Sequence, residues 1–197
     1  MELREVVRRR RMVRHFDPRP LSGEVLDRIL HSATRAPSAG FSQGLELVVL
    51  EGPEAVRGFW RATADPRFAT PYSSAEPAVI VLVLSDKQAY LDRYRAPDKA
   101  GLGMDTEEGW PVPYWDLDAA MAVMLMLLAA VDEGIGAWWF GVFHGAGALL
   151  RDLGVPEGRR LVGAVSLGWP AADDRPGGSP RTRPLRPVGQ IVHRGRW

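Results

Sequence analysis

An arginine-rich segment near the N-terminus carries the strongest chemical signal in this sequence. Residues 8–14 hold five arginines within seven positions, and Met12, Val13 and Phe16 interrupt or follow the run. The planar guanidinium group binds phosphates and carboxylates through paired N–H donors. A fully solvated basic tail has no use for apolar residues in this rhythm. The segment therefore predicts an anion site built into a fold.

A second group of arginines lies at the other end of the chain. Six arginines and no acidic residue follow Asp174, while seven arginines and three acids lie between Met1 and Arg19. Both ends are basic although the net charge is only +1, so we expect the two ends to converge on one anion. A nucleic-acid patch is the weaker alternative because the total charge is balanced, and no nucleic-acid partner is expected.

Other residue types offer little catalytic chemistry. The chain has no cysteine, which excludes disulfides and thiolate nucleophiles and is typical of a cytoplasmic protein. The four histidines have no partners at metal-ligand spacing, so no metal site is expected. His144 follows a predicted strand and is a weak candidate for substrate contact, although a lone histidine is more often structural.

The composition predicts one globular domain. A chain of 197 residues with 46% hydrophobic and 25% charged residues has the length and balance of a single well-buried domain. The longest apolar run, residues 121–131, is shorter than the ~20 residues that cross a bilayer, so no membrane association is expected.

Hydrophobic periodicity predicts helices and strands along most of the chain. Helices are expected over residues 2–10, 22–36, from 53, from 116 or 118 to 131, and over 146–153; strands are expected over 45–51, 78–84, 135–142 and 161–167. Residues 88–116 are irregular, and the tail 171–197 is rich in Pro, Gly and Arg.

The helix that ends at 131 is apolar on nearly every side, so it belongs inside the domain or inside a dimer interface. Its Met121, Met124 and Met126 are most simply core residues. The predicted class is a single α+β domain over residues 1–197.

Three separated segments resemble the FMN-dependent nitroreductase family. Residues 10–16 are similar to that family's Arg-Arg-Ser-x-Arg-x-Phe opening, and residues 36–43 to its Ala-Pro-Ser-x-x-Asn-x-Gln-Pro-Trp loop. Residues 181–185 are similar to its C-terminal basic pair. The resemblance covers essentially the whole chain. It implies an α/β sandwich with a central mixed sheet flanked by helices, a long buried central helix, and a homodimer of the domain-swapped type.

The resemblance also implies two FMN molecules bound across the subunit interface. NAD(P)H would reduce the flavin, and a small-molecule electron acceptor such as a nitroaromatic or a quinone would reoxidise it at the same face. The implied contacts to phosphate, ribityl chain and pyrimidine edge come from Arg10, Arg11, Met12, Arg14, Arg181 and Arg183. The implied contacts along the isoalloxazine come from Pro37, Ser38 and Ala39 of the partner subunit and from the backbone of Phe140, Gly141 and Val142.

Two sets of these residues keep an open alternative. Ser38 would contact the flavin or would only be a turn hydroxyl. The aromatic residues of the segment 88–116, where the family builds its variable substrate cover, would stack on a flat substrate or would only pack within the lid. They are Tyr94, Trp110, Tyr114 and Trp115.

The chain departs from the family pattern at several positions. Met12 stands where a serine is common, Phe41 replaces an asparagine, and residues 44–45 replace Pro-Trp. The flavin-cleaving branch that forms dimethylbenzimidazole also has an apolar residue at the Phe41 position. That branch, however, has an aspartate at the Met12 position and a serine at the Gly141 position, so the sequence argues against cleavage. The alternatives to an FMN-dependent NAD(P)H oxidoreductase are a flavin-sequestering protein with little turnover and a specialised flavin oxidase or dehydrogenase of a biosynthetic pathway.

Overall fold

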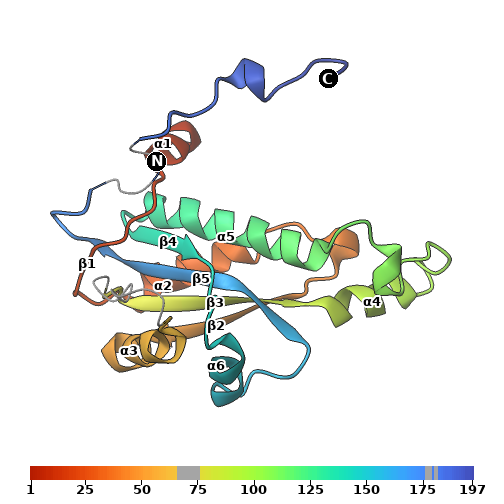
Figure 1. Cartoon of the computed structure of the whole chain (residues 1–197), viewed down its shortest axis with the longest axis horizontal. Helices are drawn as coiled ribbons and strands as arrows, with labels where there is room; N and C mark the ends of the chain where they lie inside the picture. Colours follow the sequence, from red (N-terminus) through yellow and green to blue (C-terminus); the bar gives the residue numbers. More distant parts are fainter. Residues whose placement is uncertain (66–75, 176–178, 180–181) are drawn as a thin grey trace.

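The computed structural model describes residues 1–65, 76–175, 179 and 182–197. One β-sheet lies between two helical layers (Figure 1). Helices α2 (Gly23–Ala33) and α5 (Tyr114–Asp132) pack on one face, and α3 (Gly52–Thr63) and α6 (Ala146–Asp152) pack on the other. The α+β sandwich predicted from the sequence is confirmed.

The sheet is built around strand β3 (Val79–Asp86). This strand lies between β2 (Leu45–Glu51) and β5 (Arg159–Pro170), and the far edge of β5 pairs with both β4 (Gly136–Phe140) and β1 (Phe16–Asp17). Every pairing among the described strands is antiparallel, which corrects the predicted mixed sheet. The physical reason is that the chain reverses its direction between the members of each pair. Strand β3 therefore runs antiparallel to β2, and β5 runs antiparallel to both β3 and β4.

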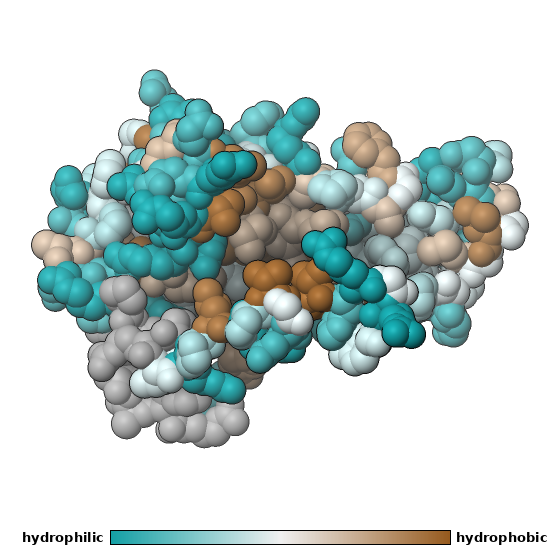
Figure 2. Space-filling view, turned by 90° about the horizontal axis from the view of Figure 1, so that it is seen from above, coloured by the Kyte–Doolittle hydropathy of each residue, from teal (hydrophilic) through white to brown (hydrophobic). Residues whose placement is uncertain are grey.

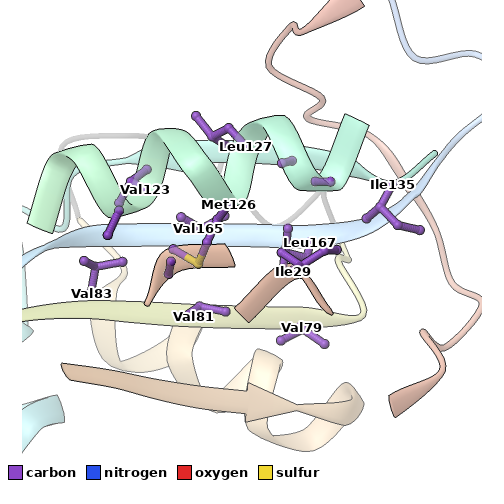
Figure 3. Packing of buried hydrophobic residues seen from close by; sticks show 14 of the residues in the cluster. Ile29, Val79, Val81, Val83, Val123, Met126, Leu127, Ile135, Val165 and Leu167 are labelled. Atoms are coloured by element: carbon purple, nitrogen blue, oxygen red, sulfur yellow. The ribbon is translucent and has the colours of Figure 1, made fainter. Parts of the chain in front are cut away.

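The continuous apolar run of β3 is buried on both faces, as its sequence predicts. Its residues alternate between the α2–α5 layer, which receives Val79, Val81 and Val83, and the α3–α6 layer, which receives Ile80 and Leu82. Figure 3 shows the first of these two cores. The sheet is therefore held from both sides.

The helix boundaries follow local capping chemistry. The Ser22 side chain accepts a hydrogen bond from the backbone N–H of Val25 at 3.3 Å, and Pro53 lies in the first turn of α3. The predicted N-terminal helix is α1 (Leu3–Arg9). Short 3₁₀ turns occur at η1 (Ala39–Phe41), η3 (Glu107–Gly109) and η5 (Val188–Gln190).

The segment 88–116 contains more helix than its sequence predicts. It contains most of helix α4 (Lys87–Arg95), which begins where the Asp86 side chain accepts a hydrogen bond from the Gln88 backbone N–H at 2.9 Å. Tyr90, Leu91 and Tyr94 form its buried face. Smaller differences are the earlier end of α2, the earlier start of α5, a shorter β4 and a longer β5.

Helix α5 is long and apolar enough to cross a membrane by length and composition alone. In the fold it is a core helix, because Ala122, Met126 and Ala130 are fully buried against the sheet. Its other side exposes Leu117, Met121 and Met124, so the prediction that all three methionines lie in the core is wrong for Met121 and Met124. Figure 2 shows the face of the molecule above α5, where apolar residues gather around a central hollow.

Candidate functional site

The arginine-rich segment lies along the outer edge of strand β4. The backbone N–H of Val13 donates to the Ala137 carbonyl oxygen at 2.9 Å, and the backbone N–H of Trp139 points to the Met12 sulfur at 3.5 Å. Val13 and Phe16 are buried against Trp138. The apolar residues in the run are thus used for burial, as predicted.

Burial of the apolar residues leaves the arginines partly exposed beside the strand. Arg10, Arg11 and Arg14 are each half-buried. The guanidinium carbon of Arg14 lies 5.5 Å from the centre of the Trp138 ring, which is a cation–π distance. Three cationic side chains are therefore held at one edge of the sheet, where they can bind an anion.

Asp174 connects this segment to the chain that follows β5. Its buried carboxylate accepts hydrogen bonds from the backbone N–H groups of Arg14 at 3.2 Å and His15 at 3.0 Å, and it forms an ion pair with Arg11. Burial by itself would raise the pKa of Asp174, but the hydrogen bonds from Arg11, His15 and Arg14 outweigh it and keep that pKa below its ordinary value. The chain just after β5 therefore contacts the arginine segment here, and Arg11 has an internal acidic partner.

The end of strand β4 provides an aromatic wall next to the arginines. The Phe140 ring stacks on Trp60 at 5.4 Å and lies 4.5 Å from Trp138, measured between ring centres. The chain then leaves the sheet at Gly141 and Val142, and the exposed ring of Phe143 folds back towards Gly141. The segment 10–14 and residues 140–142, which were predicted to share the cofactor, are therefore on adjacent parts of one edge. His144 is exposed on the same loop.

The Pro37–Ala39 loop is held by different elements. The turn η1 packs against α4 and the start of α5, whereas the arginine segment contacts β4 and β5. The Ser38 hydroxyl accepts a hydrogen bond from the Gln43 backbone N–H at 3.0 Å, so Ser38 acts as a turn residue in this chain. In Figure 1, α4 and β1 lie at opposite ends of the long axis, so one chain does not bring the loop and the arginines together.

The predicted substrate-cover aromatics are mostly buried within their own chain. Tyr94, Trp110 and Trp115 are buried in one cluster with Tyr90, and Tyr114 packs against its edge. The Trp110 indole N–H donates to the Met104 carbonyl oxygen at 2.8 Å. Of the two interpretations, lid packing is the one that the structure supports, because buried edge-to-face rings have no free face for a substrate.

The C-terminal basic pair lies in a tail that leaves the layered fold. Arg181 lies outside the described residues, and Arg183 is exposed, with its backbone N–H donating to the Ser179 carbonyl oxygen at 2.8 Å. Figure 1 shows the tail running past α1 and ending away from the sheet. Its exposed apolar side chains include Leu185, Val188 and Trp197.

Sequence reasoning missed two acidic residues that organise the site. Asp174 is the last acid before the basic tail, and Asp118 is a buried acid within the apolar helix α5. Asp174, between Asp173 and Arg175, has no such signal in the sequence. For Asp118 the signal was a charged residue within an apolar helix, where a buried carboxylate requires a partner elsewhere in the fold. The sequence does not indicate which partner that is.

A cavity of about 750 Å³ opens at another corner, where the segment after β1 meets α3. Its lining includes Pro18, Leu21, Val56 and Trp60 and contains none of the residues predicted for the cofactor. The cavity and the arginine segment are thus separate features of the described part of the chain.

The chain is similar to known proteins in sequence and in structure. The sequence profile of the nitroreductase family matches residues 7–169. A candidate NADH dehydrogenase/NAD(P)H nitroreductase from Archaeoglobus fulgidus is 29% identical over 88% of this chain and 92% of its own. A 5,6-dimethylbenzimidazole synthase from Rhodobacter capsulatus is 31% identical over 99% of this chain and 90% of its own. A solved structure of a candidate nitroreductase from Desulfovibrio desulfuricans, in complex with FMN, aligns with a TM-score of 0.68 and 25% identity over 100% of this chain and 98% of that one.

Proposed function

The chain belongs to the nitroreductase family, and on this basis we propose that it is an FMN-dependent NAD(P)H oxidoreductase acting as a homodimer. The observation that carries the proposal is the row of half-buried arginines beside strand β4, next to residues 140–142. The family resemblance implies flavin contacts at these positions, and they lie on adjacent parts of one edge of this fold.

The residues present fit an FMN molecule. Arg10 and Arg14 supply charge-assisted donors for a phosphate or a polar ring edge, whereas Arg11 is shared with Asp174. Trp138 and Phe140 supply an apolar wall beside them. Met12 turns its sulfur towards the β4 backbone, so this residue offers only its own backbone N–H to a phosphate. Bound FMN would supply hydride acceptance and electron transfer, while Arg14 would stabilise negative charge at the pyrimidine edge.

Two features support a homodimer. The Pro37–Ala39 loop and the arginine segment lie at opposite ends of the long axis of the folded chain. A site that uses both therefore needs a second copy. An exposed apolar strip of α5, formed by Leu117, Met121 and Met124, runs along the face shown in Figure 2. Exposed apolar surface of this kind is typical of a protein interface, and twofold symmetry is its commonest arrangement.

The proposed substrates are NAD(P)H and a small oxidised molecule such as a nitroaromatic or a quinone, in a cytoplasmic setting. The names of the relatives support this class, since NAD(P)H nitroreductase is the activity that the Archaeoglobus relative's name carries. A general base is not required because hydride transfer to a flavin needs position and electrostatics. His144 stays a weak candidate for substrate contact.

Purified protein tests the proposal. We expect a yellow preparation, or one that becomes yellow with added FMN, whose flavin absorbance is bleached by NADH or NADPH without oxygen and restored by a nitroaromatic or a quinone. Bound flavin that neither nicotinamide reduces would instead support a flavin-sequestering protein. A protein that rejects FMN would contradict the proposal.

Flavin cleavage is the second candidate because one relative is named 5,6-dimethylbenzimidazole synthase. Two residues of this chain oppose it. Met12 has no carboxylate, and Gly141 has no side-chain hydroxyl. We expect no dimethylbenzimidazole after incubation of reduced FMN with oxygen and the protein, and chromatographic detection of that product would reverse the order of the two candidates.

A further inference from the structure

A buried carboxylate on helix α5 binds the backbone of the Pro37–Ala39 loop. One oxygen of Asp118, Oδ2, accepts a hydrogen bond from the Ala39 backbone N–H at 2.8 Å and another from the Tyr90 hydroxyl at 2.7 Å. Asp118 is only 6% exposed, and Tyr90 is fully buried. A carboxylate in such a position is costly unless it is well hydrogen-bonded, so its partners are part of the design of this region.

Tyr90 is suited to the role of a permanent donor. Burial, together with the hydrogen bond to Asp118, raises the pKa of Tyr90 far above its ordinary value, so its hydroxyl stays protonated. The Tyr90 ring is packed edge-to-face against Trp110 and Trp115. The hydroxyl therefore has one fixed direction, towards Asp118.

A second contact holds the same loop from helix α4. The Arg93 guanidinium donates through Nε to the Gly40 carbonyl oxygen at 2.8 Å, while Asp98 holds its other nitrogens at 2.7 and 2.6 Å. Gly40 has a φ of +61°, and a Cβ there would lie 2.7 Å from the Tyr94 ring. The loop is thus bound through its backbone, against a surface that it closely fits.

The fixed backbone carries a strained and exposed residue. Phe41 follows directly, with a φ of +57° and a side chain that is 74% exposed. Non-glycine residues adopt this conformation at a cost of about 1–3 kcal/mol, and such strain persists where the surroundings impose it. The surroundings here are the contacts to Asp118 and Arg93.

We propose that Asp118, oriented by Tyr90, is a positioning residue. It holds the backbone of the Pro37–Ala39 loop in the conformation that contacts the flavin bound to a second copy of this chain. The inference rests on the proposed function and extends it, because it assigns the geometry of the flavin-covering loop to a residue that does not touch the flavin. The aromatic cluster around Trp110 then acts as the support that directs Tyr90.

Asp118→Ala and Tyr90→Phe test this role, with Asp116→Ala as the matched control. Asp116 lies on the same helix and accepts a hydrogen bond from Ser85 at 2.7 Å, but it binds Arg160 rather than the loop. We expect Asp118→Ala to raise the Kd for FMN about tenfold or more and to change the visible circular dichroism of bound flavin, with a smaller effect for Tyr90→Phe. Asp118→Asn keeps an acceptor oxygen and should recover most of the wild-type spectrum. The control should lower Tm without changing Kd or spectrum.

The outcomes separate this inference from the proposed function. Wild-type FMN affinity and spectrum in Asp118→Ala, together with a Tm loss like that of Asp116→Ala, would show a purely structural residue and overturn the inference. If the wild-type protein rejects FMN, the proposed function and the flavin part of the inference both fail. Amide hydrogen exchange of residues 38–43 then tests the other part of the inference, that Asp118 holds the backbone of this loop. Faster exchange in Asp118→Ala and Tyr90→Phe supports a loop held by Asp118, and unchanged exchange overturns it.

Discussion

Asp174 shows how a single side chain joins distant parts of this chain. It binds two backbone N–H groups of the arginine segment and the Arg11 guanidinium, and it lies just before the basic tail. Without this carboxylate, two partly buried backbone N–H groups and one cation would lose their partner. The position of Arg11 and Arg14 therefore depends on this carboxylate.

Asp174→Asn is expected to destabilise the protein at pH 7 by about 1–3 kcal/mol, the usual range for loss of a buried charged partner. Because the pKa of Asp174 is lowered on folding, its stabilisation is present above the ordinary aspartate pKa of about 3.9 and is lost as the pH falls through the lower folded value. Denaturant unfolding at pH 7 and near pH 3 should show the difference from wild type shrinking in acid. Asp173→Asn, an exposed neighbour, is the control, and an equal loss at both pH values would contradict the account.

Arg14 and Arg183 are the residues on which we expect cofactor retention to depend most. The double variant Arg14→Ala, Arg183→Ala should lose FMN retention, since each charged hydrogen bond contributes about 1.5–3 kcal/mol. Fluorescence titration with FMN measures the effect. Arg28→Ala, which removes a surface ion pair to Glu133, should bind FMN as wild type does. An unchanged Kd in the double variant would remove the arginine segment from the site.

At the scale of elements, helix α4 and the turns after it form a support rather than a cover. Their buried aromatic residues pack on one another and on the first turns of α5. The sequence left open whether the aromatic residues of this segment stack on a substrate or only pack within the lid. The structure shows that its rings are used to hold Tyr90 and Tyr94, which in turn contact Asp118 and Gly40.

Trp110→Ala separates support from substrate stacking. The buried ring should cost about 3–5 kcal/mol of unfolding free energy, while the KM for a nitroaromatic acceptor, measured well below Tm, should change little. Thermal unfolding and steady-state kinetics give the two numbers. Val112→Ala, at an exposed neighbouring position, is the control. A large rise in KM with an unchanged Tm would restore the stacking interpretation.

At the scale of the whole molecule, the two parts of the proposed flavin site lie far apart in a single folded chain. The arginine segment and the Pro37–Ala39 loop are each held by hydrogen bonds within the chain, but they lie at opposite ends of the fold. An apolar strip on α5 and several apolar side chains of the basic tail remain exposed. In the proposed homodimer, a second copy would cover the strip and bring its Pro37–Ala39 loop to the arginine segment.

Met121→Glu places a charge in the middle of the exposed strip of α5. If the strip is the dimer interface, sedimentation analysis should show a monomer, and FMN retention should fall with it, because a buried unpaired charge opposes association. Leu153→Glu, at an exposed apolar position on the opposite layer, should leave the dimer intact. A Met121→Glu protein that remains dimeric would place the interface elsewhere.

The sequence alone determined the elements whose signal is local. The apolar run of β3, the Ser22 cap and the long helix α5 were predicted because burial periodicity and capping act over a few neighbouring residues. The family and the arginine segment were found in the same way, since motif residues lie close together in the chain. Helix α4 was missed because Pro, Gly and Trp around it obscured its short apolar face.

Only the tertiary structure decided which residues hold which others in place. Asp118 lies 79 residues from Ala39, and Asp174 lies 160 from Arg14, so neither pairing has a local signal. The same holds for the burial of Trp110 and for the exposure of Met121, because each depends on which face of an element meets the sheet. The physical reason is common to all of them. A buried carboxylate or ring takes its partner from whatever the fold brings within a few ångströms, and that distance is set by packing rather than by position along the chain.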